Sequence, residues 1–187
     1  MADKTDAFEG KTLFLLRHAM ALSDGGAGDK ARRLAPRGVE DAEALGRLMA
    51  KQNYVPDFVL CSSAVRTRQT FEHLKLNIPT AAIRFEDDLY SGSTGDYLHM
   101  IQSISDDYNR VLVVAHNPSI YELVILLAAQ GADSVMQRLT EGYHPATLSI
   151  VQCKCKKWAD IQPAENTLAD FTDPMDYNAP PRPTRWM

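Results

Sequence analysis

The sequence has no hydrophobic run long enough to cross a bilayer, since its longest covers only residues 123–129 and a transmembrane helix needs roughly 20 apolar residues. Residues 1–11 are polar and lack the apolar centre of a signal peptide. Cysteine is scarce: the 3 cysteines are odd in number and form no C-x-x-C pair, so we expect reduced thiols and no zinc site. These absences predict a cytoplasmic protein without a membrane segment.

The sequence also has little net charge and lacks the usual motifs for polyphosphates and metals. A net charge of −4 provides no domain-wide basic field, which argues against a nucleic-acid partner. There is no glycine-rich loop followed by Lys-Ser/Thr for a nucleotide, and no dense acidic cluster for magnesium. We therefore expect no metal and no organic cofactor.

The length and composition that remain are those of one soluble domain. The chain has 187 residues, of which 45% are hydrophobic and 24% charged, values typical of a globular protein. We predict a polar leader over residues 1–11, one domain over 12–165 and a proline-rich tail over 166–187. The tail is expected to be extended or disordered because prolines interrupt regular structure. Docking to the domain stays open as an alternative, through Phe171, Tyr177 and Trp186.

Short apolar runs alternate with segments of helical periodicity along the chain. This alternation predicts a mainly parallel sheet between two helical layers, a three-layer α/β/α sandwich. The N-caps of two helices are predicted at Ser62 and Asn117. The predicted strands are residues 12–16, 57–61, 82–85, 111–115 and, last, 147–151, and the predicted helices begin at residue 36 or cover 63–76, 96–105 and 118–130.

Arginine and histidine recur where the predicted strands end. Arg17 and His18 follow the first strand, Arg66 lies one turn into the helix after the second, and His116 follows the strand at 111–115. In open α/β sheets, ligands bind beyond the carboxyl ends of the strands. Guanidinium groups match phosphate oxygens, and helix N-termini add partial positive charge. The pattern predicts a phosphate site.

Three motifs at these strand ends carry a family resemblance. They read LLRHA over residues 15–19, CSSAVRTRQT over 61–70 and VVAHNPS over 113–119. The chain resembles the histidine phosphatases over about residues 12–151, and so implies a phosphoglycerate mutase-like fold. It is similar to the small SixA-like phosphohistidine phosphatases in the pattern Asp29-x-x-Arg32-x-Leu34 and in the HNP form of the last motif.

The resemblance implies a catalytic role for four residues. His18 attacks phosphorus and becomes phosphorylated, while Arg17, Arg66 and His116 bind the phosphoryl oxygens. A neutral imidazole is a competent nucleophile near pH 7, and fixed cations stabilise the charge on the transferring group.

Two further residues lie near these motifs and have two interpretations each. Arg32 is expected to contact substrate or phosphate, or to be an exposed loop arginine. Asn117 is expected to be an N-cap or a ligand, with the N-cap favoured.

A general acid is the part of the site that the motifs do not supply. Relatives that cleave phosphate esters use a carboxylate between the second arginine and the second histidine, and Asp87 and Asp88 are the candidates here. SixA-like members resemble this chain in lacking a clear acid motif. Imidazole, whose conjugate acid has a pKa of about 6.5, leaves far more readily than an alkoxide, so phosphohistidine needs little or no acid assistance.

We therefore expect a phosphohistidine phosphatase that acts on a phosphorylated signalling protein, for which the family suggests a histidine-phosphotransfer protein. The short segment between Phe85 and Val111 favours a protein substrate because it leaves little chain for a lid over the site. One alternative is a phosphatase for small phosphomonoesters that uses Asp87 or Asp88 as acid. Another is a phosphate-dependent binding module without turnover.

Overall fold

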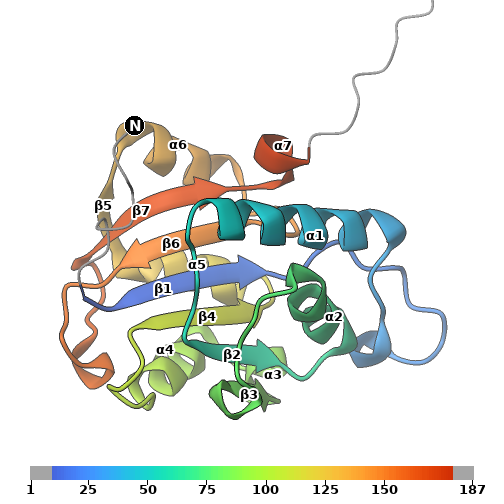
Figure 1. The fold of residues 1–187 in the computed structure, drawn as a ribbon, viewed down its shortest axis with the longest axis horizontal. Helices are drawn as coiled ribbons and strands as arrows, with labels where there is room; N and C mark the ends of the chain where they lie inside the picture. The colour runs from blue at the N-terminus through green and yellow to red at the C-terminus, as the bar shows by residue number, and fades with distance from the viewer. Residues whose placement is uncertain (1–9, 179–187) are drawn as a thin grey trace, which may run out of the picture.

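The fold is built on one mixed sheet, mostly parallel, that runs through the middle of the molecule (Figure 1). The computed structural model describes residues 10–178. In the described residues the sheet has 7 strands in the spatial order β3-β2-β4-β1-β6-β7-β5. The strands are β1 (Thr12–Arg17), β2 (Phe58–Ser62), β3 (Ile83–Glu86), β4 (Arg110–Ala115), β5 (Ala128–Gly131), β6 (Leu148–Gln152) and β7 (Asn166–Thr172).

Helices cover both faces of this sheet. In Figure 1, α1 and α2 lie on one face, and α4, α5 and α6 lie on the other. Three short 3-10 turns, at Asp29–Ala31, Thr80–Ala82 and Trp158–Asp160, complete the regular structure of the described residues. The helices are α1 (Pro36–Lys51), α2 (Val65–Leu74), α3 (Asp88–Ser91), α4 (Thr94–Gln102), α5 (Ser119–Leu127), α6 (Asp133–Glu141) and α7 (Pro174–Tyr177).

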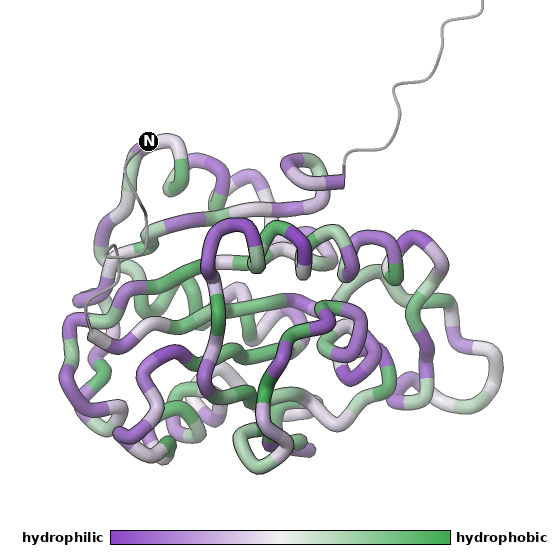
Figure 2. Tube along the Cα trace, in the orientation of Figure 1, coloured by the Kyte–Doolittle hydropathy of each residue, from purple (hydrophilic) through white to green (hydrophobic). Residues whose placement is uncertain are grey.

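Two hydrophobic cores lie on the two sides of the sheet, because successive side chains of a strand point to opposite faces. In β1, Leu13 and Leu15 join the core formed with α4, α5 and α6. Phe14 and Leu16 join the core formed with α1 and α2. Figure 2 shows the hydrophobic colour of the central strands β1 and β4. The predicted α/β/α sandwich is confirmed.

The strands beyond β1, on the side of the sheet that ends with β5, differ from the prediction in direction and number. The strand predicted last, near residues 147–151, is β6, and it runs antiparallel to β1. Two more strands follow it in space: β7 pairs antiparallel with β6, and β5 pairs parallel with β7. The helix predicted to reach residue 130 ends at Leu127, because the alanines that follow extend as β5 to pair with β7. In residues 10–178 no helix is long and apolar enough to span a membrane.

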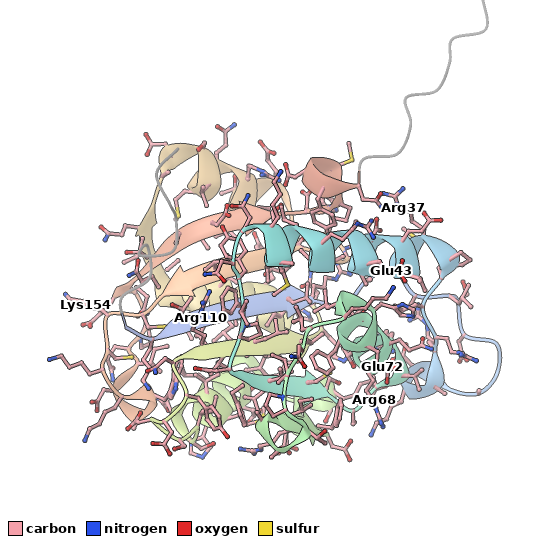
Figure 3. All side chains as sticks on the ribbon, viewed as in Figure 1. Arg37, Glu43, Arg68, Glu72, Arg110 and Lys154 are labelled. Atoms are coloured by element: carbon pink, nitrogen blue, oxygen red, sulfur yellow. The ribbon has the colours of Figure 1, made fainter. Side chains whose placement is uncertain are left out.

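The structure favours the docked alternative for the first half of the predicted tail, and the predicted domain boundary at residue 165 lies too early. Strand β7 belongs to the sheet, and Leu168 and Phe171 are buried in the core, so residues 166–178 are part of the domain. Arg37 of α1 lies beside α7 in Figure 3 and donates to the carbonyl of Asn178, which ties the two helices together. The rest of the predicted tail, with Trp186, and most of the predicted leader lie outside the described residues.

The parallel part of the sheet determines where side chains converge. Strands β1, β4, β2 and β3 are all parallel, so their carboxyl ends meet at one edge. Arg17 lies opposite Ala115 in the pairing of β1 with β4, and Cys61 lies opposite Val114 in the pairing of β2 with β4. Residues that follow these strands are therefore neighbours in space.

Candidate active site

The four residues predicted to be catalytic lie together at this edge of the sheet. Arg17 ends β1 and His18 follows it, while His116 directly follows β4. Arg66 is the second residue of α2, which begins shortly after β2. The imidazole rings of His18 and His116 have their centroids 5.0 Å apart. The strand-end pattern in the sequence thus corresponds to one cluster of side chains.

The hydrogen bonds of His18 indicate which ring nitrogen is free to react. Its Nδ1 lies 2.8 Å from the carbonyl oxygen of Ala19, and a carbonyl only accepts, so we assign the ring proton to Nδ1. Nε2 then carries the lone pair, and it accepts a hydrogen bond from Nε of Arg66 at 3.2 Å. Nε2 is the nucleophilic atom that this tautomer presents.

The surroundings of His18 keep its ring neutral. Burial lowers the pKa of His18 to about 4, and the positive charges of Arg66, Arg17 and Arg32 act in the same direction, against the bond to the Ala19 carbonyl. Burial and nearby cations both disfavour the charged imidazolium. The lone pair of Nε2 is therefore available at neutral pH, as nucleophilic catalysis requires.

Arg66 is a buried cation with all three of its nitrogens engaged, and only 6% of the residue is exposed. Besides the bond from Nε to His18, Nη1 donates to the carbonyl of Asp29 at 2.7 Å and Nη2 donates to the Asp29 carboxylate at 3.0 Å. Each Nη carries a second proton, which leaves donors for a ligand.

Arg17 is held by the backbone of Tyr143. Its Nη1 donates to the Tyr143 carbonyl at 2.5 Å, and that carbonyl also accepts from the amide of Asn117 at 3.1 Å. The Tyr143 ring is buried and its hydroxyl donates to the carbonyl of Leu15. Within residues 10–178, Nε of Arg17 is buried and has no hydrogen-bond partner. A buried donor of this kind calls for an acceptor such as a phosphoryl oxygen.

His116 presents a second buried nitrogen without a partner. Its Nε2 lies 2.8 Å from the hydroxyl of Ser62, which also accepts from the backbone N–H of Ala64. We assign the hydroxyl proton of Ser62 to Nε2, which puts the His116 proton on Nδ1. That nitrogen is buried and unpaired within the described range. Burial and then the neighbouring His18 and Arg66 lower the pKa of His116 to about 3, so the ring is a neutral donor.

These groups together form an anion site around a nucleophile. Two guanidinium cations and a neutral N–H donor surround His18, and the Nε atom of Arg17 and Nδ1 of His116 both lack partners in the part of the chain described. Planar guanidinium groups match the oxygens of a tetrahedral phosphoryl group. The arrangement can bind a phosphoryl group and stabilise charge on its oxygens during transfer.

The two further candidate ligands, Arg32 and Asn117, have partners within the protein. Arg32 donates from Nη1 to the Asp29 carboxylate at 2.9 Å and from Nε to the carbonyl of Leu22 at 2.7 Å. Asn117 is not the N-cap of α5, because the helix begins at Ser119 with Pro118 in the capping position. The Asn117 side-chain amide instead donates to the carbonyl of Tyr143, which also accepts from Arg17.

The two candidate acids lie at the rim. Asp87 accepts from Nζ of Lys30 at 2.5 Å and from the hydroxyl of Ser63, and these bonds lower its pKa. It is therefore a carboxylate at neutral pH, with no proton to give. Asp88 is exposed in the first turn of α3. A cavity of about 500 Å³ opens on this side and is lined in part by Asp29, Lys30 and Ser63.

Sequence reasoning missed several residues that build the site. Ser62 was predicted to cap α2, but it ends β2 and holds His116, and the cap is Ala64. Asp29 was noted in a motif without a role. Tyr90, in α3, has no part in the motifs, but its ring packs edge-on to His116, with 5.6 Å between the ring centroids. The motif spacing around Asp29 was the one available signal, since the other contacts are formed by residues far apart in sequence.

No cluster of three or more His, Cys, Asp or Glu side chains that could hold a metal ion occurs in the described range, residues 10–178. The three cysteines there are free thiols. Cys61 is buried in the core beside α1 and α2.

Comparison with known proteins decides the family. Residues 13–109 match the model of the histidine phosphatase superfamily, branch 1. The chain belongs to that superfamily. The matched segment of this histidine phosphatase superfamily member contains Arg17, His18 and Arg66, and it ends before His116. Membership indicates phosphatase activity and agrees with a site that combines a nucleophilic histidine with cations.

Individual relatives agree with this family and with the fold. The uncharacterized protein Rv1276c of Mycobacterium tuberculosis is 32% identical over 161 residues, covering 85% of this chain and 99% of that protein. The structure of a candidate phosphohistidine phosphatase SixA from Nakamurella multipartitia is 30% identical with a TM-score of 0.75, covering 88% and 96% of the two chains. A second such candidate, from Agrobacterium tumefaciens, is 27% identical with a TM-score of 0.73, covering 89% and 100%. This superfamily member is thus SixA-like and phosphoglycerate mutase-like in structure.

Proposed function

We propose that the protein is a phosphohistidine phosphatase, which takes the phosphoryl group of a phosphohistidine side chain onto Nε2 of His18 and then passes it to water. One observation carries the proposal: the pocket pairs a neutral nucleophile with two cations, whereas Asp87 is held as a carboxylate by Lys30 at the rim. The machinery for phosphoryl transfer is present, and an acid for a poor leaving group is not evident among the described residues.

The first displacement follows from the resting hydrogen bonds. As the substrate phosphorus approaches Nε2 of His18, the Nε–H of Arg66 shifts from that nitrogen to a phosphoryl oxygen. Nε of Arg17 and Nδ1 of His116 donate to other oxygens. The lone pair of Nε2 forms the new P–N bond. The P–N bond of the substrate, whose other ring nitrogen carries a proton, breaks, and its electron pair stays on the departing neutral imidazole. Fixed donors stabilise the charge on the transferring group without reorganisation.

The second displacement returns the enzyme to its resting state. Water attacks phosphorus, the bond to Nε2 breaks, and the lone pair returns to His18. The proton released by water ends on phosphate or solvent. Throughout both steps the Nδ1–H of His18 keeps donating its hydrogen bond to the carbonyl of Ala19. This bond stabilises the ring as Nε2 becomes substituted.

The leaving group supports phosphohistidine over a phosphate ester. Imidazole departs as a base whose conjugate acid has a pKa of about 6.5, whereas an alkoxide needs a proton from a general acid. An ionised Asp87 is unsuited to that task, since Lys30 and Ser63 lower its pKa.

The open approach to the site supports a protein substrate. Between β3 and β4 the chain forms only α3 and α4, and a cavity lies beside Asp29, the partner of Arg66, and Tyr90, which packs on His116. A phosphorylated side chain on another protein can enter such a site. We expect a signalling protein of the cytoplasm, such as a histidine-phosphotransfer protein, as the partner.

The test compares initial rates on a phosphohistidine protein and on p-nitrophenyl phosphate. The variants are His18→Ala and a double variant that carries Asp87→Asn and Asp88→Asn. The proposal predicts phosphohistidine hydrolysis that depends on His18 and is unchanged by the two Asn substitutions. Efficient ester hydrolysis that the double variant abolishes would instead assign the protein to small phosphomonoesters.

A further inference from the structure

The carboxylate of Asp29 lies beside Arg66 and has no part in the mechanism above. Asp29 begins a short 3-10 turn in the loop after β1, and half of its side chain is exposed. Its Oδ2 accepts from Nη2 of Arg66 at 3.0 Å and from the hydroxyl of Tyr90 at 3.0 Å, and its Oδ1 accepts from Nη1 of Arg32 at 2.9 Å. Its carbonyl accepts from Nη1 of Arg66 at 2.7 Å.

These contacts divide the guanidinium of Arg66 into two edges. Nη1 and Nη2 form the end of the planar fork, and both donate to Asp29: Nη1 to its backbone carbonyl and Nη2 to its carboxylate. The Nε–H, on the side of the fork, points at Nε2 of His18. Because the guanidinium is planar, holding its end determines the direction of its Nε edge.

Asp29 is itself held in place and kept ionised. Hydrogen bonds from Arg32 and then from Tyr90, together with Arg66, lower the pKa of Asp29 to about 2. The Tyr90 ring also lies over the guanidinium of Arg66, with 5.8 Å between its centroid and Cζ. The carboxylate is thus a permanent anion with two supports of its own.

We propose that Asp29 is a positioning residue that acts through Arg66: it holds the outer edge of the guanidinium so that the Nε edge faces the phosphoryl group on His18. Arg32 and Tyr90 act one step further out, by holding Asp29. This inference rests on the proposed function only in that the site binds a phosphoryl group. It assigns Arg32 a supporting contact in place of direct contact with substrate.

The test measures the affinity of the site for orthovanadate by calorimetry, which needs no turnover. Asp29→Ala is expected to weaken binding about tenfold, the scale of losing charge-assisted hydrogen bonds. Asp29→Asn keeps a side-chain acceptor and should fall between Ala and wild type. Asp24→Asn is the matched control, since it removes one carboxylate from the same loop. Within residues 10–178, Asp24 accepts only from the backbone of Gly26 and Gly28. That variant should bind within about twofold of wild type.

A double-mutant cycle separates positioning from loop stability. In an Arg66→Lys background, which lacks the planar fork, Asp29→Ala should change the affinity for orthovanadate by less than about twofold, because the two residues act as one unit. Equal losses in both backgrounds would overturn the proposal, and so would tighter binding by Asp29→Ala, which would make Asp29 a competitor of the ligand.

Tyr90→Phe provides a second route if Asp29→Ala does not fold. It removes one hydrogen bond to Asp29 and keeps the ring, so it should weaken orthovanadate binding less than Asp29→Ala and lose its effect in Arg66→Lys. Unchanged binding by this variant would count against the proposal. If phosphohistidine is not a substrate but the cycle shows coupling, only the proposed function fails.

Discussion

Nε of Arg66 lies 3.2 Å from Nε2 of His18, so the buried guanidinium donates to the same ring nitrogen that we propose as the nucleophile. In the resting state this bond occupies the lone pair and holds the ring in place. In the proposed mechanism an incoming phosphoryl oxygen accepts this Arg66 hydrogen bond in place of Nε2, which frees the lone pair for attack. In that mechanism Arg66 is both the partner of the nucleophile and a ligand of the transferring group.

Replacing Arg66 by lysine tests whether the fork, and not only the charge, matters. Lysine keeps the charge but cannot donate to His18 and Asp29 at the same time. Arg66→Lys should therefore lower kcat/KM on phosphohistidine protein by about 100-fold. The matched control is Arg68→Lys on the same helix, whose guanidinium stacks on Phe85 at 4.6 Å and is labelled in Figure 3. Equal activity of the two variants would contradict the role of Arg66.

Ser62 should control the orientation of His116. Ser62→Ala removes the only hydrogen-bond partner of Nε2 found in the described residues, so the ring loses its fixed tautomer and kcat should fall about tenfold. The neighbouring Ser63→Ala removes a hydroxyl that bonds Asp87 at the rim, and its kcat should stay within about twofold of wild type. Steady-state rates at saturating substrate distinguish the two, and a larger loss from Ser63→Ala would count against this account.

The His18 ring should titrate far below an ordinary histidine. Its pKa of about 4 lies below the usual value because burial and the nearby arginines disfavour the charged form. The neutral Nδ1–H tautomer should therefore persist as pH falls from 7 to about 5 and be lost near 4. Nitrogen-15 NMR of the histidine side chains, with His18→Ala to assign the signal, measures both tautomer and midpoint. A midpoint near 6.5 would refute the burial argument.

The same pKa shift has a consequence for stability. In the unfolded chain His18 takes up its proton near pH 6.5, whereas in the folded protein it does so only near pH 4. The unfolded state therefore binds more protons between these values, and the free energy of unfolding should decrease as pH falls through this window. Denaturant titrations of wild type and His18→Ala should show a smaller pH dependence in the variant.

Strand β7 should be essential for the stability of the domain. Phe171 is only 3% exposed and its ring packs against Tyr143, so Phe171→Ala should reduce the free energy of unfolding by about 3 kcal/mol. Met175 on α7 is 65% exposed, so Met175→Ala should change it by less than about 0.5 kcal/mol. Urea titrations of both variants provide the measurement. A negligible loss for Phe171→Ala would mean that residues 166–178 are a dispensable tail.

The central part of the site was predictable because it depends on local patterns. Each of the residues His18, Arg66 and His116 lies at the end of a continuous apolar run or at the start of the helix that follows, and parallel strands bring such ends together. Asp87 could be proposed as an acid from its position in the sequence. Its salt bridge to Lys30, which argues against that role, joins segments far apart in the chain.

The parts that were missed depend on long-range pairing. Ala128 and Ala129 continue the apolar run of α5 and favour helix, yet they form β5 by pairing with β7. Asn166 looks like a tail residue, but its buried amide donates to the carbonyls of Leu127 and Gln162 and so fixes the start of β7. No local pattern in the sequence predicts such a contact.

The most direct test of the central claim is to trap the phosphorylated enzyme. The protein is mixed with excess labelled phosphohistidine protein, quenched in alkaline detergent during the first turnovers and mapped by mass spectrometry. The proposed mechanism predicts one acid-labile, alkali-stable phosphoryl group on His18. It should be absent from His18→Ala, which should also release no phosphate. Phosphate release without label on His18, or label on any other residue, would contradict it.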